Sequence, residues 1–228
     1  MEILYQDNRI LVCLKPPGIL STDEVGGMPA LLRAQLGDEH ACVRTVHRLD
    51  RVVGGVMVFA RSREANRRLC AQVSARQMEK TYLAVVHGCV ERREGELRDW
   101  LLRSRAERKT YRADGPEPGA QEAVLRYRVL AVHEGLSLVR IALQTGRTHQ
   151  IRAQFSGHGY PLVGDRKYGA PEDGTGAHEI ALWSYRLAFC HPQTGERLSF
   201  AALPPEKQPW TQFPELSRMG EEERSVKK

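Results

Sequence analysis

Residues 45–51 read Thr-Val-His-Arg-Leu-Asp-Arg and lead directly into the apolar run Val-Val-Gly-Gly-Val-Met-Val-Phe at residues 52–59. The run is typical of a buried strand because it is short, uncharged and rich in β-branched residues. Asp50 stands between Arg48 and Arg51, just ahead of that strand. Most aspartates in such a place are loop acids paired with neighbouring cations, and these residues alone favour that interpretation. The alternative is a carboxylate that positive neighbours keep ionised, available as a nucleophile or a base.

The composition is that of an ordinary globular protein, with 228 residues, 41% of them hydrophobic and 27% charged. No apolar run approaches the roughly 18 residues of a membrane span, and we expect no signal peptide. The five cysteines are odd in number and lack C-x-x-C spacing, and the eight histidines lack ligand spacing. We therefore expect a cytoplasmic protein with reduced thiols, no metal and no membrane contact.

Positive charge is concentrated in two blocks, although the net charge is only +6. Residues 44–80 hold nine Lys/Arg against three Asp/Glu, and residues 140–168 hold five against one. The two blocks therefore carry more than the whole excess, which suits a basic cleft for phosphates. The arginines between residues 61 and 76 are explained as well by the solvated face of a helix.

Periodicity and turn residues predict several strands and fewer helices. Ser62 is a plausible N-cap, and residues 91–122 are polar enough for a mobile hairpin or surface excursion. Tyr82, on its own, is better explained as a core aromatic residue. We expect strands at residues 9–14, 56–60, 79–88, 124–130, 136–143, 181–189 and 197–201, and helices at residues 29–36 and 63–74.

A second informative stretch, Gln-Thr-Gly-Arg-Thr-His-Gln-Ile-Arg-Ala-Gln-Phe-Ser-Gly-His-Gly, occupies residues 144–159. Thr148 can cap a helix that the glycines at 157 and 159 would end. The N-terminus of that helix, beside Arg147, is a candidate phosphate-binding site. Arg152 lies one turn inside on the same face and is flanked by apolar residues, so we expect it to face inward towards an acid.

Four blocks of this sequence, in this order, resemble the RluA type of RNA pseudouridine synthase. The later pairs Gly164-Asp165 and Tyr168-Gly169 fit as well, and the resemblance extends over about residues 3–203. Any one block would be weak, but four in order at sensible spacing are specific. The blocks are Lys-Pro-Pro-Gly at 15–18, His-Arg-Leu-Asp at 47–50, Lys-Thr-Tyr at 80–82 and Gly-Arg-Thr-His-Gln-Ile-Arg at 146–152.

The resemblance implies an α+β fold, with a mixed, mostly antiparallel sheet, flanking helices and a central active-site cleft. It implies one catalytic domain at residues 1–203 and a C-terminal tail at residues 204–228, which we expect to be partly disordered because it has little to bury. We expect a stand-alone domain, without the S4 module that the family often carries. The implied activity is isomerisation of uridine to pseudouridine in ribosomal or transfer RNA, without cofactor or metal. We expect a monomer.

The resemblance also assigns the site. Asp50 matches the family's catalytic aspartate, Tyr82 the tyrosine beneath the target base, and Arg152 the arginine paired with the aspartate. Arg48 would occupy the space that the flipped nucleotide leaves. The remaining residues expected to bind substrate are His47, Lys80, Arg147, Thr148 and His149.

One departure from the family pattern follows the aspartate. The family usually shows Thr-Ser-Gly where this chain has Val53-Gly54-Gly55, so two hydroxyl groups are missing one turn from Asp50. The catalytic residues are untouched, but substrate contacts carried over from other members are put in doubt.

The residue types suit the implied chemistry. The C1′–N1 bond must break, the base must turn, and C5 must bond to the sugar. Asp50 can add to C6 of the uracil or act at the sugar, and the sequence leaves both routes open. Either route needs an ionised carboxylate, which a buried cation such as Arg152 would favour. Extruding the base costs a few kcal/mol, and stacking on Tyr82 returns about 1–3 kcal/mol.

Two other classes of function compete with the synthase. The first is a catalytically inactive RNA-binding paralogue, supported only by the change at residues 53–54. The second is an N-glycosidase-type hydrolase with Asp50 and a second carboxylate, for which the motif blocks offer only Asp165.

Overall fold

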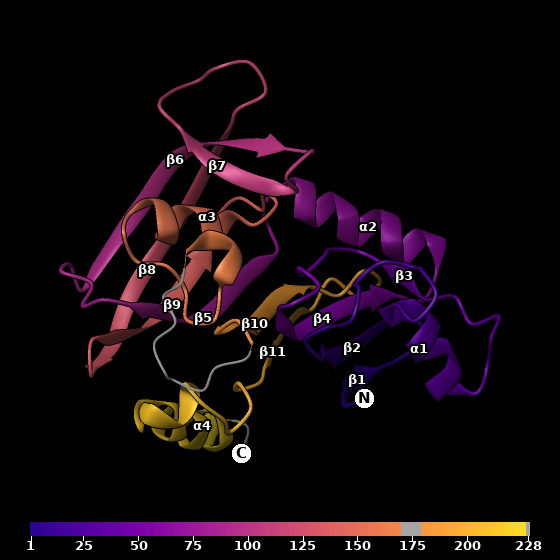
Figure 1. The fold of residues 1–228 in the computed structure, drawn as a ribbon. Helices are drawn as coiled ribbons and strands as arrows, with labels where there is room; N and C mark the ends of the chain where they lie inside the picture. The colour runs from indigo at the N-terminus through magenta and orange to yellow at the C-terminus, as the bar shows by residue number, and fades with distance from the viewer. Residues whose placement is uncertain (170–178, 227–228) are drawn as a thin grey trace. The chain divides into compact units, whose positions relative to one another are not determined.

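The computed structural model describes residues 1–169 and 179–226, the last six of these by their backbone alone. The chain forms two compact units (Figure 1). The first unit comprises residues 1–81 and 183–202, and the second comprises residues 82–182 and 203–228.

The strands of the first unit follow the predicted positions closely. Neighbouring strands pair antiparallel, except that β4 and β10 run parallel. A short strand, β3 (Arg44–Thr45), pairs with β4, and β11 (Arg197–Ala201) pairs with β10. The order of the remaining strands is β1 (Ile3–Gln6), β2 (Ile10–Lys15), β4 (Gly54–Ala60) and β10 (Leu182–Cys190).

Two helices accompany this sheet, and both confirm the sequence prediction. Helix α1 (Met28–Leu36) ends at Gly37 in a left-handed conformation. Helix α2 (Arg63–Ser74) begins after Ser62, whose hydroxyl oxygen accepts a hydrogen bond from the Ala65 N–H at 3.1 Å. Ala65 and Leu69 of α2 are buried in a core shared with β2, β4 and β10, while its arginines face solvent.

The second unit contains the longer strands. Strand β5 (Glu79–His87) carries the chain from the first unit into the second, and the strand order there is β5-β9-β8-β6-β7. Strands β8 (Gln121–His133) and β9 (Leu136–Leu143) pair as predicted. Their connection needs only Glu134 and Gly135, with φ values of 48° and 75°, the left-handed backbone of a tight hairpin turn.

The polar stretch at residues 91–122 forms the expected hairpin, from β6 (Glu94–Ser104) and β7 (Lys109–Ala113). It is not an excursion away from the fold. Residues 94–101 of β6 pair with residues 121–128 of β8, so the hairpin extends the sheet. Apolar side chains such as Leu101 supply its buried side, and the surrounding charges hide them in the sequence.

Helix α3 (Gln150–Gly157) lies against β6 and β7. The rings of its Phe155 and of Tyr127 in β8 pack edge to face, with their centroids 5.8 Å apart. The predicted cap by Thr148 is wrong. The residue before the helix is His149, at φ 55°, and no side chain caps it. Thr148 instead accepts a hydrogen bond from the Thr110 hydroxyl on its carbonyl oxygen at 2.9 Å. A short turn of 3-10 helix, η1 (Arg166–Tyr168), follows.

The expectation that the tail has little to bury is wrong for its first part. A 3-10 turn, η2 (Trp210–Gln212), precedes helix α4 (Glu215–Val226). The side chains of Trp210, Phe213 and Leu216 are buried within the second unit. The domain boundary at residue 203 stays a prediction. None of the described helices is long and apolar enough to cross a membrane.

We predict that Phe213→Ala lowers the free energy of unfolding by about 3–5 kcal/mol, because it empties a well-packed site. The exposed neighbour Thr211 offers a matched control, and Thr211→Ala should change that free energy by no more than about 0.5 kcal/mol. Urea unfolding measures both. Equal, small effects would mean that this segment is not packed in solution.

Candidate active site

Asp50 lies in a tight turn between β3 and β4. Its carbonyl oxygen accepts a hydrogen bond from the Val53 N–H at 3.0 Å, and its side chain is half-buried. The preceding residue, Leu49, is clamped by the buried hydroxyl of Ser21. That hydroxyl donates to the Leu49 carbonyl at 2.9 Å and accepts from the Leu49 N–H at 3.0 Å. The backbone that carries Asp50 is therefore held on both sides.

Residues Lys15–Gly18 are hydrogen-bonded to the same turn. Lys15 is fully buried, and its ammonium group donates to the carbonyl oxygens of Pro16 at 2.9 Å and Arg51 at 3.2 Å. Gly18 and Arg51 exchange two further hydrogen bonds, Gly18 N–H to the Arg51 carbonyl and Arg51 Nε to the Gly18 carbonyl, both at 2.8 Å. Two of the blocks singled out in the sequence are therefore bound to each other.

Lys15 also brings a positive charge to Asp50 within the first unit. Burial lowers the pKa of Lys15 to about 8, and the negative charge of Asp50 opposes that shift. At neutral pH the ammonium form prevails, so a cation lies beneath the turn. The sequence indicates a turn at this block but not a buried charge.

His47 fills a gap in the sheet. Strand β4 pairs with β10 at residues 54–55 and with β3 at residues 59–60. Among the described residues, no strand pairs with residues 56–58 on that side. His47 Nε2 accepts the Val58 N–H at 3.3 Å, and the Ser184 hydroxyl donates to the Val56 carbonyl at 3.0 Å. Burial, together with the charge of Lys80, lowers the pKa of His47 to about 3, so the ring is neutral. A contact between His47 and RNA stays a prediction.

The remaining residues expected on this side differ in exposure. Arg48 is exposed, as a residue that contacts RNA must be, and Lys80 is half-buried, with its pKa lowered by burial. Tyr82 is buried, which suits a core aromatic and a base-stacking ring equally. The assigned role of Tyr82 stays a prediction.

In the second unit, Arg152 faces an acid, as the sequence predicted. The guanidinium group makes a bidentate ion pair with Asp165, with Nε 2.7 Å from Oδ2 and Nη2 2.8 Å from Oδ1. Both side chains are buried. Its Cζ also lies 4.9 Å from the centre of the Tyr168 ring. The pairing of Arg152 with Asp50 stays a prediction.

Tyr168 links this ion pair to His149. The Tyr168 hydroxyl oxygen accepts the Thr110 N–H at 2.8 Å and lies 2.9 Å from His149 Nδ1. Burial raises the pKa of Tyr168, so its hydroxyl keeps the proton and can donate it to Nδ1. With Nδ1 as acceptor, a neutral His149 carries its hydrogen on Nε2.

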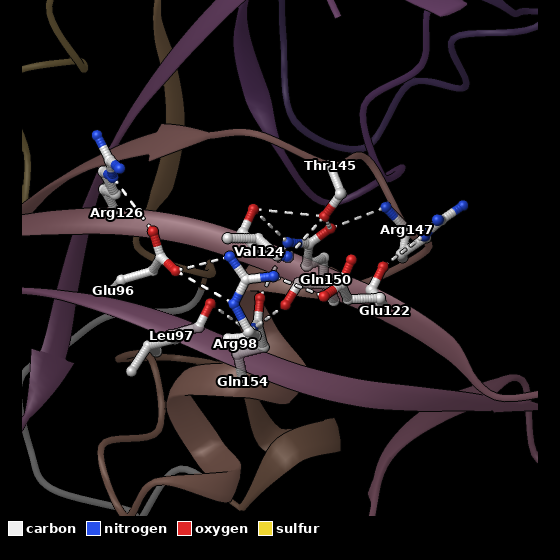
Figure 2. A network of polar contacts seen from close by, with 11 residues as sticks. Glu96, Leu97, Arg98, Glu122, Val124, Arg126, Thr145, Arg147, Gln150 and Gln154 are labelled. Atoms are coloured by element: carbon white, nitrogen blue, oxygen red, sulfur yellow. Dashed lines mark hydrogen bonds and ion pairs between the residues drawn. The ribbon is translucent and has the colours of Figure 1, made fainter. Parts of the chain in front are cut away.

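Two buried glutamines fix α3 and the loop before it to the sheet, as Figure 2 shows. Gln150 Oε1 accepts from the Thr145 hydroxyl at 2.8 Å and from the Arg147 N–H at 3.0 Å. Its Nε2 donates to Gln154 Oε1 at 3.0 Å, and Gln154 donates to the carbonyl oxygens of Leu97 and Ala123, each at 3.2 Å. This network takes the place of the side-chain cap that the sequence predicts at the start of α3.

The network leaves Arg147 and Thr148 near the surface. Arg147 is half-buried and donates from Nε to the Glu122 carbonyl at 3.0 Å, and Thr148 is exposed. The charges nearby on the sheet largely neutralise one another, because Arg98 pairs with Glu96 and Glu122, and Arg126 pairs with Glu96 (Figure 2). Within the described residues, no three His, Cys, Asp or Glu side chains gather as metal ligands would.

Comparison with known proteins identifies the family. A family model described as RNA pseudouridylate synthase matches residues 9–157. The dual-specificity RNA pseudouridine synthase RluA of Haemophilus influenzae is 32% identical over 206 residues, which cover 89% of this chain and 92% of that protein. The chain belongs to the RluA family of RNA pseudouridine synthases. It is therefore an enzyme, an RNA uridine isomerase.

Other relatives of this synthase agree. The tRNA pseudouridine synthase C of Pasteurella multocida is 33% identical over 89% of this chain and 90% of that protein. An uncharacterized RNA pseudouridine synthase, YhcT of Bacillus subtilis, is 34% identical over 86% of this chain, but this chain spans only 66% of that protein.

Solved structures confirm the fold of the synthase. Human RNA pseudouridylate synthase domain containing 1 superposes with a TM-score of 0.77 over 94% of this chain and 85% of that chain, at 22% identity. Human RNA pseudouridylate synthase domain containing 4 gives 0.76 over 95% and 93% at the same identity. The predicted mixed, mostly antiparallel fold is confirmed, while the central cleft stays a prediction.

The neutral, buried His47 of the synthase predicts a pH dependence of stability. Its pKa is about 3 in the folded protein, against an ordinary value of 6.5, so below pH 6.5 only the unfolded chain takes up the proton. Stability should fall as the pH falls, by about 2 kcal/mol between pH 7 and pH 5 from this residue alone. His47→Gln keeps an acceptor for Val58 without the titration, so urea unfolding should show a smaller loss. Identical losses would contradict a neutral, buried His47.

The ion pair between Arg152 and Asp165 gives a second prediction. Asp165→Asn leaves a buried guanidinium without its counter-charge and should lower the free energy of unfolding by about 3–5 kcal/mol. Asp23→Asn breaks an exposed pair with Arg33 and should cost less than about 1 kcal/mol. Urea unfolding of both variants checks this, and a small loss for Asp165→Asn would show that the pair is not buried in solution.

Proposed function

We propose that this enzyme converts uridine to pseudouridine in ribosomal or transfer RNA, with Asp50 as the catalytic carboxylate. The observation that carries the proposal is the support given to the Asp50 turn. Buried groups fix the backbone on both sides of Asp50, and the fully buried ammonium group of Lys15 lies beneath it. A loop acid that only pairs with surface arginines needs no such support, whereas a catalytic carboxylate needs a fixed position and a positive neighbour.

The proposed reaction conserves every atom of the nucleotide. The C1′–N1 bond breaks, the uracil turns, and a C1′–C5 bond forms; C5 gives up its proton and N1 takes one up, so nothing is gained or lost. Asp50 either adds through a carboxylate oxygen to C6 of the uracil and is later released, or acts at the sugar to assist the departure of the base. Both routes need the ionised carboxylate, and neither consumes a second substrate.

Arg152 and Tyr82 complete the proposed catalytic group. A guanidinium with one edge bound to Asp165 keeps a fixed orientation, so Arg152 can present its remaining N–H groups to the Asp50 carboxylate. Tyr82 offers an aromatic face for the extruded base. Its hydroxyl group can also relay the C5 proton at the end of the reaction, accepting it on oxygen while giving up its own.

RNA binding is proposed to rest on contacts from both units, mainly from exposed or half-buried groups; His47 is the exception, because it is buried. Arg48 would enter the space that the flipped nucleotide leaves, with His47 and Lys80 beside it. Arg147, Thr148 and His149 lie before the N-terminus of α3, where backbone N–H groups favour an anion. The Nε2 hydrogen of a neutral His149 suits a phosphate oxygen.

The substrate class follows from the relatives only in part. One relative is named for dual specificity and another for transfer RNA. The second name supports transfer RNA, ribosomal RNA stays in the proposal from the family resemblance, and a cytoplasmic monomer remains our working expectation. Mapping pseudouridine in total RNA with and without the gene would identify the uridine.

The alternatives differ in what they leave unexplained. In a hydrolase, Asp165 would have to act as the second carboxylate, yet both its oxygens are bound to buried Arg152. An inactive paralogue has only the change at residues 53–54 in its favour, and it would not need the buried cation under Asp50.

We predict that Asp50→Asn melts like wild type, binds substrate RNA about as well and makes no pseudouridine. Asparagine keeps the shape and the hydrogen bonds of the turn but is far too weak a nucleophile or base. The control is Asp114→Asn, in the β7–β8 loop, which should keep full activity. Nucleoside analysis of reacted RNA by mass spectrometry reads the product.

Each outcome of that experiment points to one class of protein. A product of unchanged mass that elutes as pseudouridine supports a synthase. Free uracil with an abasic site would indicate a hydrolase, and no product from wild type on any native RNA an inactive binding protein. Wild-type turnover by Asp50→Asn would refute the role of Asp50.

A further inference from the structure

Gly54, the residue at the departure from the family pattern, has no room for a side chain. A Cβ atom added to Gly54 would lie 2.4 Å from Cζ3 of Trp183, and 3.0 Å from both the Lys15 carbonyl oxygen and Cδ of Pro17. Real Cβ atoms essentially never come closer than 3.0 Å to another atom, and a contact of 3.0 Å is already tighter than nine in ten. The indole ring and the Lys15–Pro17 turn therefore close on the one point where a side chain of residue 54 would begin.

Trp183 is held firmly in this place. It is the partner of Gly54 where β10 pairs with β4, its ring is buried, and its Nε1 donates to the Ala202 carbonyl at 2.8 Å. The next pair is tighter still, since a Cβ on Gly55, at φ 121°, would lie 2.3 Å from the Ser184 carbonyl oxygen. The backbones of β4 and β10 are therefore in close contact at this point, and the ring is pressed against Gly54.

The ring lies against Gly54, and the Lys15–Pro17 segment faces the same glycine, so both segments that hold the Asp50 turn meet at Gly54. Gly54 follows Val53, whose N–H closes the turn on the Asp50 carbonyl. The Lys15–Pro17 segment holds the Arg51 carbonyl through the Lys15 ammonium group. A large, rigid ring pressed against Gly54 limits how far this glycine, and with it the end of the Asp50 turn, can move.

We propose that Trp183 is a positioning residue for Asp50, and that its ring replaces the small hydroxyl side chain that the family carries at position 54. This proposal rests on the proposed function, because positioning matters only if Asp50 acts on the substrate. Residues 54 and 183 form a coupled pair, in which a side chain at 54 requires a smaller residue at 183. Trp183 then compensates for the missing side chain at residue 54, and the change at residues 53–54 is not a sign of lost activity.

A double-mutant cycle tests the coupling. Gly54→Ser alone forces the ring or the turn to shift and should slow single-turnover pseudouridine formation by about 10²-fold, the loss expected from a misplacement of about 1 Å. Trp183→Ala alone loosens the turn and should slow the rate by roughly tenfold, with RNA affinity unchanged. The double variant should react at least about tenfold faster than Gly54→Ser. Independent residues would give a loss equal to the product of the two single losses, which would overturn the proposal.

Stability has to be separated from positioning. Rates are measured well below each melting temperature and divided by the folded fraction. Trp210→Ala removes another buried tryptophan, from the second unit, and should lower the melting temperature while leaving the corrected rate within about twofold of wild type. If Trp183→Ala also keeps the wild-type corrected rate, Trp183 serves only stability and the proposal fails.

Amide hydrogen exchange tests the same inference without any activity. The N–H groups of Val53 and Gly18 donate to the Asp50 and Arg51 carbonyls. They should exchange at least about tenfold faster in Trp183→Ala, while the Val85 N–H, bound to Ala181 in the second unit, should not change. Unchanged exchange at Val53 and Gly18 would contradict the proposal even if wild type made no pseudouridine. A lack of product from wild type with faster exchange in the variant would instead refute the proposed function alone.

Discussion

The arrangement around Asp50 depends on the hydrogen bonds that the buried Lys15 ammonium group donates to backbone carbonyls. A charge removed from water is costly unless carbonyl dipoles and a counter-charge replace its hydration. In this protein the Pro16 and Arg51 carbonyls and the charge of Asp50 supply that replacement. Because the ammonium group needs the Arg51 carbonyl where it is, the energy that keeps Lys15 buried also keeps the Asp50 turn in one conformation.

The second unit solves a similar problem with a different cation. Arg152 is buried on a short helix, and the Asp165 carboxylate and the Tyr168 ring take the place of water around its guanidinium group. The glutamines of α3 hold that helix on the sheet through backbone carbonyls, so the position of Arg152 is fixed by the sheet itself. Each unit therefore uses buried polar interactions to fix one charged group of the proposed catalytic pair.

The sequence predicts most of the strands and helices and the four motif blocks, but not the contacts that connect them. Periodicity and an N-cap locate α2 to the residue, since those signals are local. The sequence indicates Lys15 only as part of a turn, because lysine is almost never buried unless it is paired. The Thr148 cap fails because a tertiary contact through Gln150 outweighs a local rule, and the prolines and charges after residue 203 hide the spacing of Trp210, Phe213 and Leu216. The contact of Gly54 with Trp183 joins distant segments and leaves no local signal.

Asp50 and Arg152, each fixed within its own unit, are proposed to act on one extruded uridine. A crystal structure of the Asp50→Asn variant with substrate RNA tests this most directly, because the substrate stays unreacted. We predict a uracil out of its stack and against the Tyr82 ring, with the residue 50 side chain in contact with C6 or C1′ and Arg152 within hydrogen-bonding distance of that side chain. A uridine that remains stacked in the RNA, or that is bound away from residue 50, would contradict the proposal.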